Sequence, residues 1–272
     1  MTRTPPAADD PGTGKMLRAV DGGIGIMTFD NAARHNAVSL AMWEAAETIL
    51  ADFAADPALR VVVLAGAGGR AFVSGADISR FESERAGAEA VGRYAARTAR
   101  VYDLLYDFPK PTIAMVRGHC IGGGVALAVC CDLRIASDDA DFGIPAARLG
   151  LGYGLSGIER LTALIGPAFA KEMFFTARRF SAAEALAMDL INRVVPAEAL
   201  EATVMELART IAANAPLTVD STKFLINQAM KPPAARDPAR AEALVAACFA
   251  SEDYIEGRRA FLEKRPPRFK GR

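Results

Sequence analysis

The stretch that decides the fold runs from Lys110 to Tyr153 and reads KPTIAMVRGHCIGGGVALAVCCDLRIASDDADFGIPAARLGLGY. Its first part, residues 112–116, is a short apolar run rich in β-branched residues, which predicts a buried strand. Three consecutive glycines at 122–124 lead from this strand into VALAVCC at 125–131. That segment is apolar on every side and is closed by Asp132, so we expect a short helix that is buried all round.

The triple glycine favours a site for negative charge. Glycine loses more backbone freedom on folding than any other residue, so Gly122, Gly123 and Gly124 suit a helix start only if something must approach the backbone there. The first N–H groups of a helix have no partner inside the helix, and the helix dipole stabilises negative charge at that end. We therefore expect these glycines to offer N–H donors to an anion or a developing oxyanion.

A second loop of small residues has a matching position. Residues 71–78, AFVSGADI, follow the strand-like run 60–66, RVVVLAG. Their backbone can line the same pocket, and two such loops can converge on one carbonyl oxygen.

With these two loops the sequence resembles the crotonase, or enoyl-CoA hydratase/isomerase, superfamily. The F-x-x-G-x-D loop of that family matches Phe72, Gly75 and Asp77. Its G-x-x-x-GGG-x-x-L-x-x-x-C-D-x-R-I-A segment matches Gly118 through Ala136. The similarity runs from about residue 16 to the end of the chain.

The resemblance implies an α/β fold of the crotonase type, a spiral of ββα units followed by an α-helical trimerisation region. We expect a tail over 1–15, a ββα core with the acyl-CoA site over 16–196, and a helical oligomerisation region over 197–272. The start of the chain is rich in Pro, Asp, Gly and Thr and has no apolar core of a signal peptide, so we predict a disordered tail.

The residue patterns agree with a strand-strand-helix rhythm that becomes mainly helical after residue 155. We predict a β-hairpin of 17–20 and 24–29 and a helix over 40–54 capped by Ser39. Further strands are predicted at 60–65, 112–116 and 190–195. Further helices are predicted at 87–107, 158–165, 168–176, 182–188, 197–213, 217–230, 237–250 and 252–263.

Composition narrows the classes of partner. Lys plus Arg and Asp plus Glu both number 32 in 272 residues, so no global field attracts nucleic acid or an anionic membrane, and the phosphates of coenzyme A need a local basic rim. No segment reaches the ~18 uninterrupted apolar residues of a membrane span. The four cysteines have no metal-binding spacing, and Cys120, Cys130 and Cys131 lie in apolar sequence, which predicts core residues in a reducing, cytoplasmic compartment.

The resemblance also implies the binding residues. The N–H groups of Ala76 and Gly123 would form an oxyanion hole for the thioester oxygen of an acyl-CoA. Arg34 and His35 would lie near the adenosine and pantetheine, and Ser74 near the adenine through its backbone. The family often has a phosphate-binding lysine two residues after the aspartate of this loop, where this chain has Ser79 followed by Arg80.

The basic end of the chain has two interpretations. Charged chain ends are commonly solvated and frayed. In the family, however, the matching residues reach the coenzyme A of a neighbouring subunit, so Phe261 and Lys264 become candidate contacts in a homotrimer or a dimer of trimers. The resemblance implies no metal and no tightly bound cofactor, with coenzyme A present only as part of the substrate.

The chemistry departs from that of the hydratases in the family, which use two glutamates. Their positions are Ala126 and Ala146 here, and the extra aspartate of the dienoyl-CoA isomerases is Gly154. Losing general acid–base help costs about 10²–10⁴ in rate per group. We therefore expect a non-hydratase reaction on a thioester enolate.

Decarboxylation of a malonyl-type CoA needs fewer acid–base groups than hydration does. The segment IPAARLGLGY matches the methylmalonyl-CoA decarboxylase-like members of the family, in which a tyrosine follows the Leu-Gly pair. Tyr153 would hold the carboxylate perpendicular to the thioester plane, with Arg148 nearby. The histidine and glutamate of that decarboxylase are Ala76 and Ala126 here, so the match is incomplete.

Several of these side chains also have structural interpretations. Tyr153 can be a core or subunit-contact residue, Arg148 an ion-pair partner, and His119 a structural histidine. Asp77 and Asp132 are expected to cap backbone or to pack, and Glu159 to pair with a neighbouring arginine.

Two further functions stay open. One is a pseudoenzyme that binds acyl-CoA without turnover, and the other is a hydratase or isomerase with a relocated acid or base. An α/β-hydrolase is disfavoured because the sequence has no Gly-x-Ser-x-Gly elbow.

Overall fold

Two sheets carry the strands of the protein, which is described here by a computed structural model over residues 14–77 and 87–272. The larger sheet has the strand order β1-β2-β3-β5-β7-β10 and the smaller one β4-β6-β8-β9. The strands of the larger sheet are β1 (Lys15–Asp21), β2 (Ile24–Asp30), β3 (Val61–Gly66), β5 (Thr112–Val116), β7 (Leu133–Ser137) and β10 (Arg193–Val195). Those of the smaller sheet are β4 (Ala71–Val73), β6 (His119–Ile121), β8 (Asp141–Gly143) and β9 (Phe180–Ser181).

A ββα unit occurs three times along the described chain. A strand of the larger sheet is followed by a short strand of the smaller sheet and then by a helix: β3, β4 and α3; β5, β6 and α4; β7, β8 and α5. The helices are α3 (Ala88–Tyr106), α4 (Gly123–Cys130) and α5 (Ala146–Leu149). The predicted crotonase-type α/β fold is confirmed.

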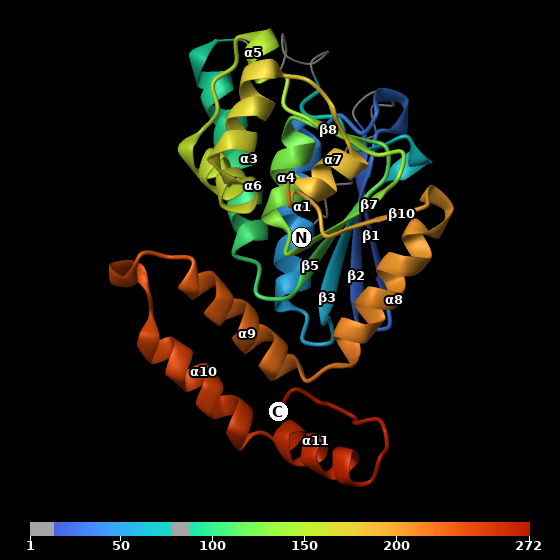
Figure 1. Cartoon of the computed structure of the whole chain (residues 1–272), viewed down its shortest axis with the longest axis vertical. Helices are drawn as coiled ribbons and strands as arrows, with labels where there is room; N and C mark the ends of the chain where they lie inside the picture. The colour runs from blue at the N-terminus through green and yellow to red at the C-terminus, as the bar shows by residue number, and fades with distance from the viewer. Residues whose placement is uncertain (1–13, 78–86) are drawn as a thin grey trace, which may run out of the picture.

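The middle strands of the larger sheet, β3 and β5, are buried on both faces, whereas the edge strand β1 is largely exposed (Figure 1). On one face Val61 and Val63 pack with Val204 of α8 (Leu200–Ala213), and on the other Val62 and Leu64 join the main core with α1, α3 and α4. Successive side chains of a strand point to opposite faces, which is why the continuous apolar run of β3 fits this place. The helix α8, at the start of the region we predicted as helical, is therefore part of the packing of the sheet.

The N-terminal elements follow the prediction closely. Strands β1 and β2 pair antiparallel around Gly22 and Gly23, which have φ angles of 53° and 89°. Ser39 caps α1 (Leu40–Ala55) by accepting a hydrogen bond from the backbone N–H of Met42 at 3.3 Å. Residues 1–13 of the predicted tail 1–15 lie outside the described residues. The predicted end of the tail is one residue too late, because Lys15 is the first residue of β1.

The structure differs from the predictions at several elements, including α5 and β9, which were not predicted. Strands β4, β6 and β8 have three residues each, too few for an alternating pattern to be visible in the sequence. Helix α4 begins at Gly123 and so includes two of the glycines. The two helices predicted at 158–165 and 168–176 form one element, α6 (Leu155–Thr176), with a break at Gly166, whose φ is 71°.

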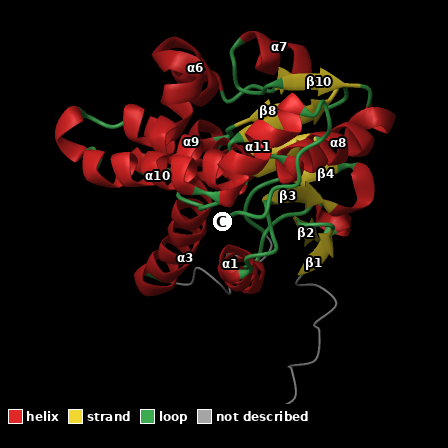
Figure 2. Cartoon of the chain, turned by 90° about the horizontal axis from the view of Figure 1, so that it is seen from below, coloured by secondary structure: helices red, strands yellow, loops and turns green. Residues whose placement is uncertain are grey.

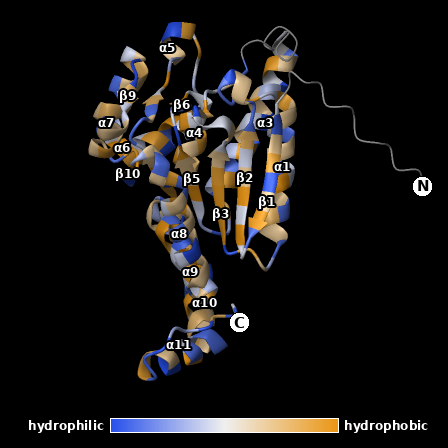
Figure 3. Cartoon of the chain, turned by 90° about the vertical axis from the view of Figure 1, so that its right-hand side faces the viewer, coloured by the Kyte–Doolittle hydropathy of each residue, from blue (hydrophilic) through white to orange (hydrophobic). Residues whose placement is uncertain are grey.

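The last helices extend away from the sheets as an arm (Figures 1 and 3). After α7 (Ala182–Ala187) and α8 come α9 (Pro216–Ala229), α10 (Pro238–Ala250) and α11 (Glu252–Leu262). Viewed along the arm, these helices lie across one end of the sheets (Figure 2). None of the described helices combines the length and apolar character that a bilayer span requires.

Candidate active site

The orientation of the Ala76 N–H is fixed by an isolated bridge between Val38 and Ala76. The N–H of Val38 donates to the carbonyl of Gly75 at 2.8 Å, and the N–H of Asp77 donates to the carbonyl of Val38 at 3.1 Å. In a trans peptide the C=O and N–H point in opposite directions, and the described chain has no cis peptide. Because the Gly75 carbonyl faces Val38, the N–H of Ala76 points away from it.

The Gly123 N–H is oriented in the same way at the start of α4. Gly122, with φ 55°, caps the helix, and its N–H donates to the carbonyl of Gly143 at 2.8 Å. Its carbonyl accepts from the N–H of Ala126 at 3.1 Å, as in a helix. The peptide N–H of Gly123 therefore points out of the N-terminus of α4, where a helix stabilises negative charge.

These two peptide units lie side by side. A Cβ added to Gly75 would be 3.6 Å from the Gly123 nitrogen, and one added to Gly123 would be 3.5 Å from the Gly75 Cα. A Cβ on Gly124 would be 2.0 Å from the carbonyl oxygen of Val73. Close packing of α4 against β4 thus requires glycine here, which explains why the glycines lie inside the helix.

The loop before α1 is bound to this region by Asn36. This buried side chain, at a φ of 56°, donates to the carbonyls of Ala67 and Ala71 at 2.9 and 2.7 Å and accepts from the N–H of Asn31 at 2.9 Å. The sequence alone did not reveal this role of Asn36. An asparagine directly before the apolar residues of a helix start was the available signal.

Arg34, His35 and Ser74, predicted near the coenzyme A, are brought together by the same loop. The Ser74 N–H donates to the His35 carbonyl at 3.1 Å, and the Ser74 hydroxyl to the Arg34 carbonyl at 3.3 Å. The guanidinium of Arg34 pairs with the buried carboxylate of Asp77 at 3.2 Å and is 42% exposed. This ion pair joins the two loops and supports the interpretation of Asp77 as a structural residue. Ser79 and Arg80 lie outside the described residues.

Next to these residues is a cluster around His119. Its Nδ1 lies 2.7 Å from a carboxylate oxygen of Asp141, whose other oxygen accepts from Arg179 at 2.6 Å. The rings of His119 and His35 meet edge to face at 5.5 Å. His119 therefore has structural partners, and Asp132 likewise accepts from the Thr112 N–H at 2.7 Å and pairs with Lys223 at 2.7 Å.

Tyr153 lies near the start of α4, between α5 and α6. Its hydroxyl is 3.8 Å from the position of a Cβ on Gly122, and its ring packs on Phe174 at 5.0 Å. Burial alone raises the pKa of Tyr153 to about 12, so the phenol is a neutral donor at ordinary pH. Arg148 is exposed, and neither Arg148 nor Glu159 has an ion pair within the described part of the chain.

The two positions of the hydratase glutamates differ in exposure. After Gly123, every residue of α4 is buried except Ala126, which is partly buried. Ala146, at the start of α5, is buried with 5% of its surface exposed. Cys120, Cys130 and Cys131 are buried, as predicted, and burial raises the pKa of Cys130 to about 11. Within residues 14–77 and 87–272 no group of three His, Cys, Asp or Glu side chains is placed to hold a metal ion.

Phe261 belongs to α11 and Lys264 follows it, and α11 lies at the far end of the arm from α4 and α5 (Figure 1). Most residues of the basic end are exposed to solvent, as the structural interpretation expects, but the end is hydrogen-bonded and not frayed. The N–H groups of Lys270 and Gly271 both donate to the buried carboxylate of Asp253 at 2.7 Å, and Arg60 donates to the Lys270 carbonyl at 3.3 Å.

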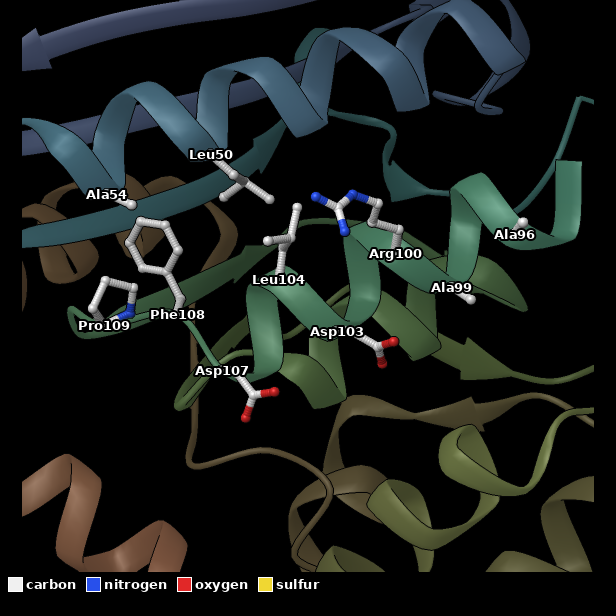
Figure 4. A pocket seen from close by; sticks show the side chains of 10 residues that line it. All are labelled: Leu50, Ala54, Ala96, Ala99, Arg100, Asp103, Leu104, Asp107, Phe108 and Pro109. Carbon is white, nitrogen blue, oxygen red and sulfur yellow. The ribbon is translucent and has the colours of Figure 1, made fainter. Parts of the chain in front are cut away.

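A groove of about 400 Å³ lies elsewhere, between α1 and α3 (Figure 4). Leu50, Leu104 and Phe108 form its apolar wall, and Arg100 and Asp103 lie along it. None of its lining residues belongs to the two glycine-bearing peptide units, so we do not place the reaction there.

Comparisons with known proteins identify the family of the chain. The family model described as enoyl-CoA hydratase/isomerase matches residues 19–272. A crotonyl-CoA hydratase from Syntrophomonas wolfei is 38% identical over 79% of this chain and 82% of its own length. A carnitinyl-CoA dehydratase from Citrobacter koseri is 35% identical over 90% and 94%. The crystal structure of an enoyl-CoA hydratase/carnithine racemase from Magnetospirillum magneticum superposes with a TM-score of 0.89 at 34% identity, covering 94% of this chain and 96% of that one.

The match extends over nearly the whole described chain and includes both glycine loops. These three relatives are 34–38% identical to it over the aligned regions. The chain therefore belongs to the enoyl-CoA hydratase/isomerase family of the crotonase superfamily.

Proposed function

We propose that this protein acts on an acyl-CoA thioester by stabilising its enolate between the N–H groups of Ala76 and Gly123, in a non-hydratase reaction. The observation that carries the proposal is the pair of adjacent peptide units. In each peptide unit the carbonyl, that of Gly75 or of Gly122, accepts a backbone hydrogen bond, and the N–H of the next residue points in the opposite direction. Oriented N–H donors of this kind can be worth 10²–10³ in rate each.

The favoured reaction is decarboxylation of a malonyl-type CoA. The bond between Cα and the carboxylate breaks, its electron pair forms the enolate, carbon dioxide leaves, and Cα takes a proton from water. Ala76 and Gly123 donate to the enolate oxygen. The neutral hydroxyl of Tyr153 donates to the carboxylate and holds it perpendicular to the thioester plane.

The side chains at 126 and 146 support a non-hydratase reaction. A methyl group neither orients water nor transfers a proton, so Ala126 and Ala146 supply none of the acid–base help that hydration needs. Ala126 is only partly buried, so a substrate substituent could approach α4 at this position.

The test measures carbon dioxide release from methylmalonyl-CoA, ethylmalonyl-CoA and malonyl-CoA. We expect turnover of at least one, and a loss of about tenfold or more in Tyr153→Phe because the carboxylate loses its donor. Tyr254→Phe, which removes a hydroxyl from the arm, is the matched control. Absence of release from all three substrates would refute the decarboxylase assignment.

The names of the relatives favour hydration as the second candidate. It requires an acid or base at a position other than 126 and 146. Loss of the enoyl absorbance of crotonyl-CoA on addition of the protein would establish it. Saturable binding of acyl-CoA with no product from either reaction would instead identify a binding protein without turnover.

We also propose that the arm is covered by further copies of this chain, as a homotrimer or a dimer of trimers. Phe249, Phe261 and Leu262 are 63%, 84% and 79% exposed, which is unusual for large apolar side chains. Phe261 and Lys264 would then contact the coenzyme A bound by a neighbour. Arg34, His35 and Ser74 would contact it from the same subunit as the oxyanion hole.

A further inference from the structure

We propose that Tyr94 and Tyr102 of α3 are positioning residues, each of which holds in place one of the two peptide units that carry the N–H groups of Ala76 and Gly123. This inference rests on the proposed function, because it assigns a role in the oxyanion hole. The two hydroxyls come from one helix, eight positions apart, a spacing that keeps both on the same stripe of the helix.

Tyr94 acts through Val38. Its hydroxyl donates to the Val38 carbonyl at 3.1 Å, the same oxygen that accepts from the Asp77 N–H. The N–H of Val38 in turn binds the Gly75 carbonyl and so fixes the plane of the Gly75–Ala76 peptide. Val38 is fully buried and Tyr94 is 4% exposed, so water does not replace this bond readily.

Tyr102 acts directly on α4. Its hydroxyl donates to the carbonyl of Gly123 at 3.3 Å. The hydroxyl oxygen of Tyr102 lies 3.1 Å from the position that a Cβ on residue 123 would occupy. Tyr102 therefore limits movement of the first turn of α4, on which the direction of the Gly123 N–H depends.

Trp43 of α1 joins the two tyrosines. Its Nε1–H donates to the Tyr94 hydroxyl at 2.9 Å, and its ring meets that of Tyr102 edge to face at 5.5 Å. The Tyr94 hydroxyl thus accepts one hydrogen bond and donates another, which fixes its rotation. One helix and one buried tryptophan hold both sides of the hole.

Such support matters because an oxyanion hole depends on donors that are aligned before the reaction begins. A displacement of about 1 Å at a reacting group can cost 10²-fold in rate. Removal of either hydroxyl leaves the aromatic ring in its packing position. We therefore expect weaker polarisation of the thioester and little change in coenzyme A binding.

The test uses 4-dimethylaminocinnamoyl-CoA, whose absorption moves to longer wavelength when hydrogen bonds pull charge onto the thioester oxygen. With the wild-type chain at saturation we expect a red shift. Tyr94→Phe and Tyr102→Phe should each lose at least half of that shift while Kd changes by less than about threefold. With any substrate that is turned over, kcat should fall about tenfold and KM should stay nearly constant.

Tyr106→Phe is the matched control, since it makes the same substitution on the same helix, where the ring packs against Arg160. It should keep the full red shift. Tyr102→Phe leaves the acceptor of the Trp43 N–H in place, so it carries the test even if Tyr94→Phe, which removes that acceptor, fails to fold. Circular dichroism and the fluorescence of Trp43, the single tryptophan of the chain, report the folded state.

The outcomes separate the two proposals. Binding of the probe to the wild-type chain without a red shift would overturn the oxyanion hole and with it the proposed function. A red shift that both variants retain in full would overturn the positioning role alone. A loss of the shift in Tyr106→Phe as large as in Tyr102→Phe would also overturn it, because the effect would then not depend on the bonded hydroxyls.

Discussion

Helices α4 and α11 place their apolar residues in opposite surroundings. In α4, Val125 and Leu127 are 1% and 0% exposed, and no methyl group fits at residue 124. In α11, Phe261 is 84% exposed. Contacts inside the chain thus account for the apolar residues of α4. They do not account for the exposed phenylalanine of α11. The difference shows which helix serves the site and which helix presents a surface.

The crowding of α4 gives the largest expected effect. In Gly124→Ala the new methyl would lie 2.0 Å from the Val73 carbonyl oxygen, so α4 or β4 must shift. We expect the free energy of unfolding to fall by about 3 kcal/mol or more, as measured by urea denaturation.

The control for that experiment is Gly92→Ala in α3, where no atom of the described residues lies within 4 Å of the new methyl. It should stabilise the protein by about 0.5–1 kcal/mol, since alanine has less backbone freedom to lose. Equal effects of the two substitutions would show that the packing of α4 is not the reason for its glycines.

The arm has one buried charge that tests how firmly its end is attached. Asp253 is 3% exposed and accepts hydrogen bonds from the N–H groups of Lys270 and Gly271. Such bonds to a charged acceptor contribute about 1.5–3 kcal/mol each. Asp253→Ala should therefore speed hydrogen exchange of these two amides by about 10–100-fold.

Glu252→Ala is the neighbouring control, because the ion pairs of Glu252 are largely exposed. It should leave the exchange of Lys270 and Gly271 nearly unchanged. Unchanged exchange in Asp253→Ala as well would mean that the end of the chain is held by other contacts.

Tyr153, beside the start of α4, gives an effect that depends on pH. Burial raises its pKa to about 12, against about 10 in the unfolded chain. The folded state therefore holds this proton more tightly, and the resulting stability is present in full below pH 10 and is lost as pH rises through 12. The loss is on the order of 1–3 kcal/mol.

This effect is measured as the difference in unfolding free energy between the wild-type chain and Tyr153→Phe at several pH values from 8 to 11.5. The difference should be constant up to about pH 10 and then move against the wild type. Tyr254→Phe on α11 is the comparison variant. A difference that stays flat over the whole range would show that the Tyr153 hydroxyl is not buried.

The smallest expected effect on stability comes from the exposed end of α11. Phe261→Ser should change the unfolding free energy of the chain at low concentration by less than about 0.5 kcal/mol, because the side chain is 84% exposed. If further copies cover the arm, the same substitution should lower the mass measured by light scattering at high concentration. If the wild-type chain assembles and Phe261→Ser has the same mass, the interface between copies does not include Phe261.

Much of the site was predictable because it is made of backbone. Gly75, Gly122 and Gly123 were recognisable in the sequence, since glycine runs beside apolar segments have few other reasons to exist. Ala126 and Ala146 were equally informative through the carboxylates they lack. Arg34, His35 and Ser74 lie together around one loop, and their contact with coenzyme A stays a prediction.

The supporting residues were not predictable. Tyr94 and Tyr102 fall within the predicted helix 87–107 and had no role assigned from the sequence. Their hydroxyls donate to the carbonyls of Val38 and Gly123, which lie 56 and 21 positions away in the chain. Likewise, nothing in the local sequence of the basic end indicated that Asp253 would bind it back onto α11.

The sequence by itself determined the fold class and the two glycine loops. Apolar periodicity and glycine placement act over a few residues and are therefore visible in a linear chain. Only the tertiary structure decided which way each peptide N–H points and which hydroxyls hold it there, because those bonds join segments that meet only after the sheets have formed.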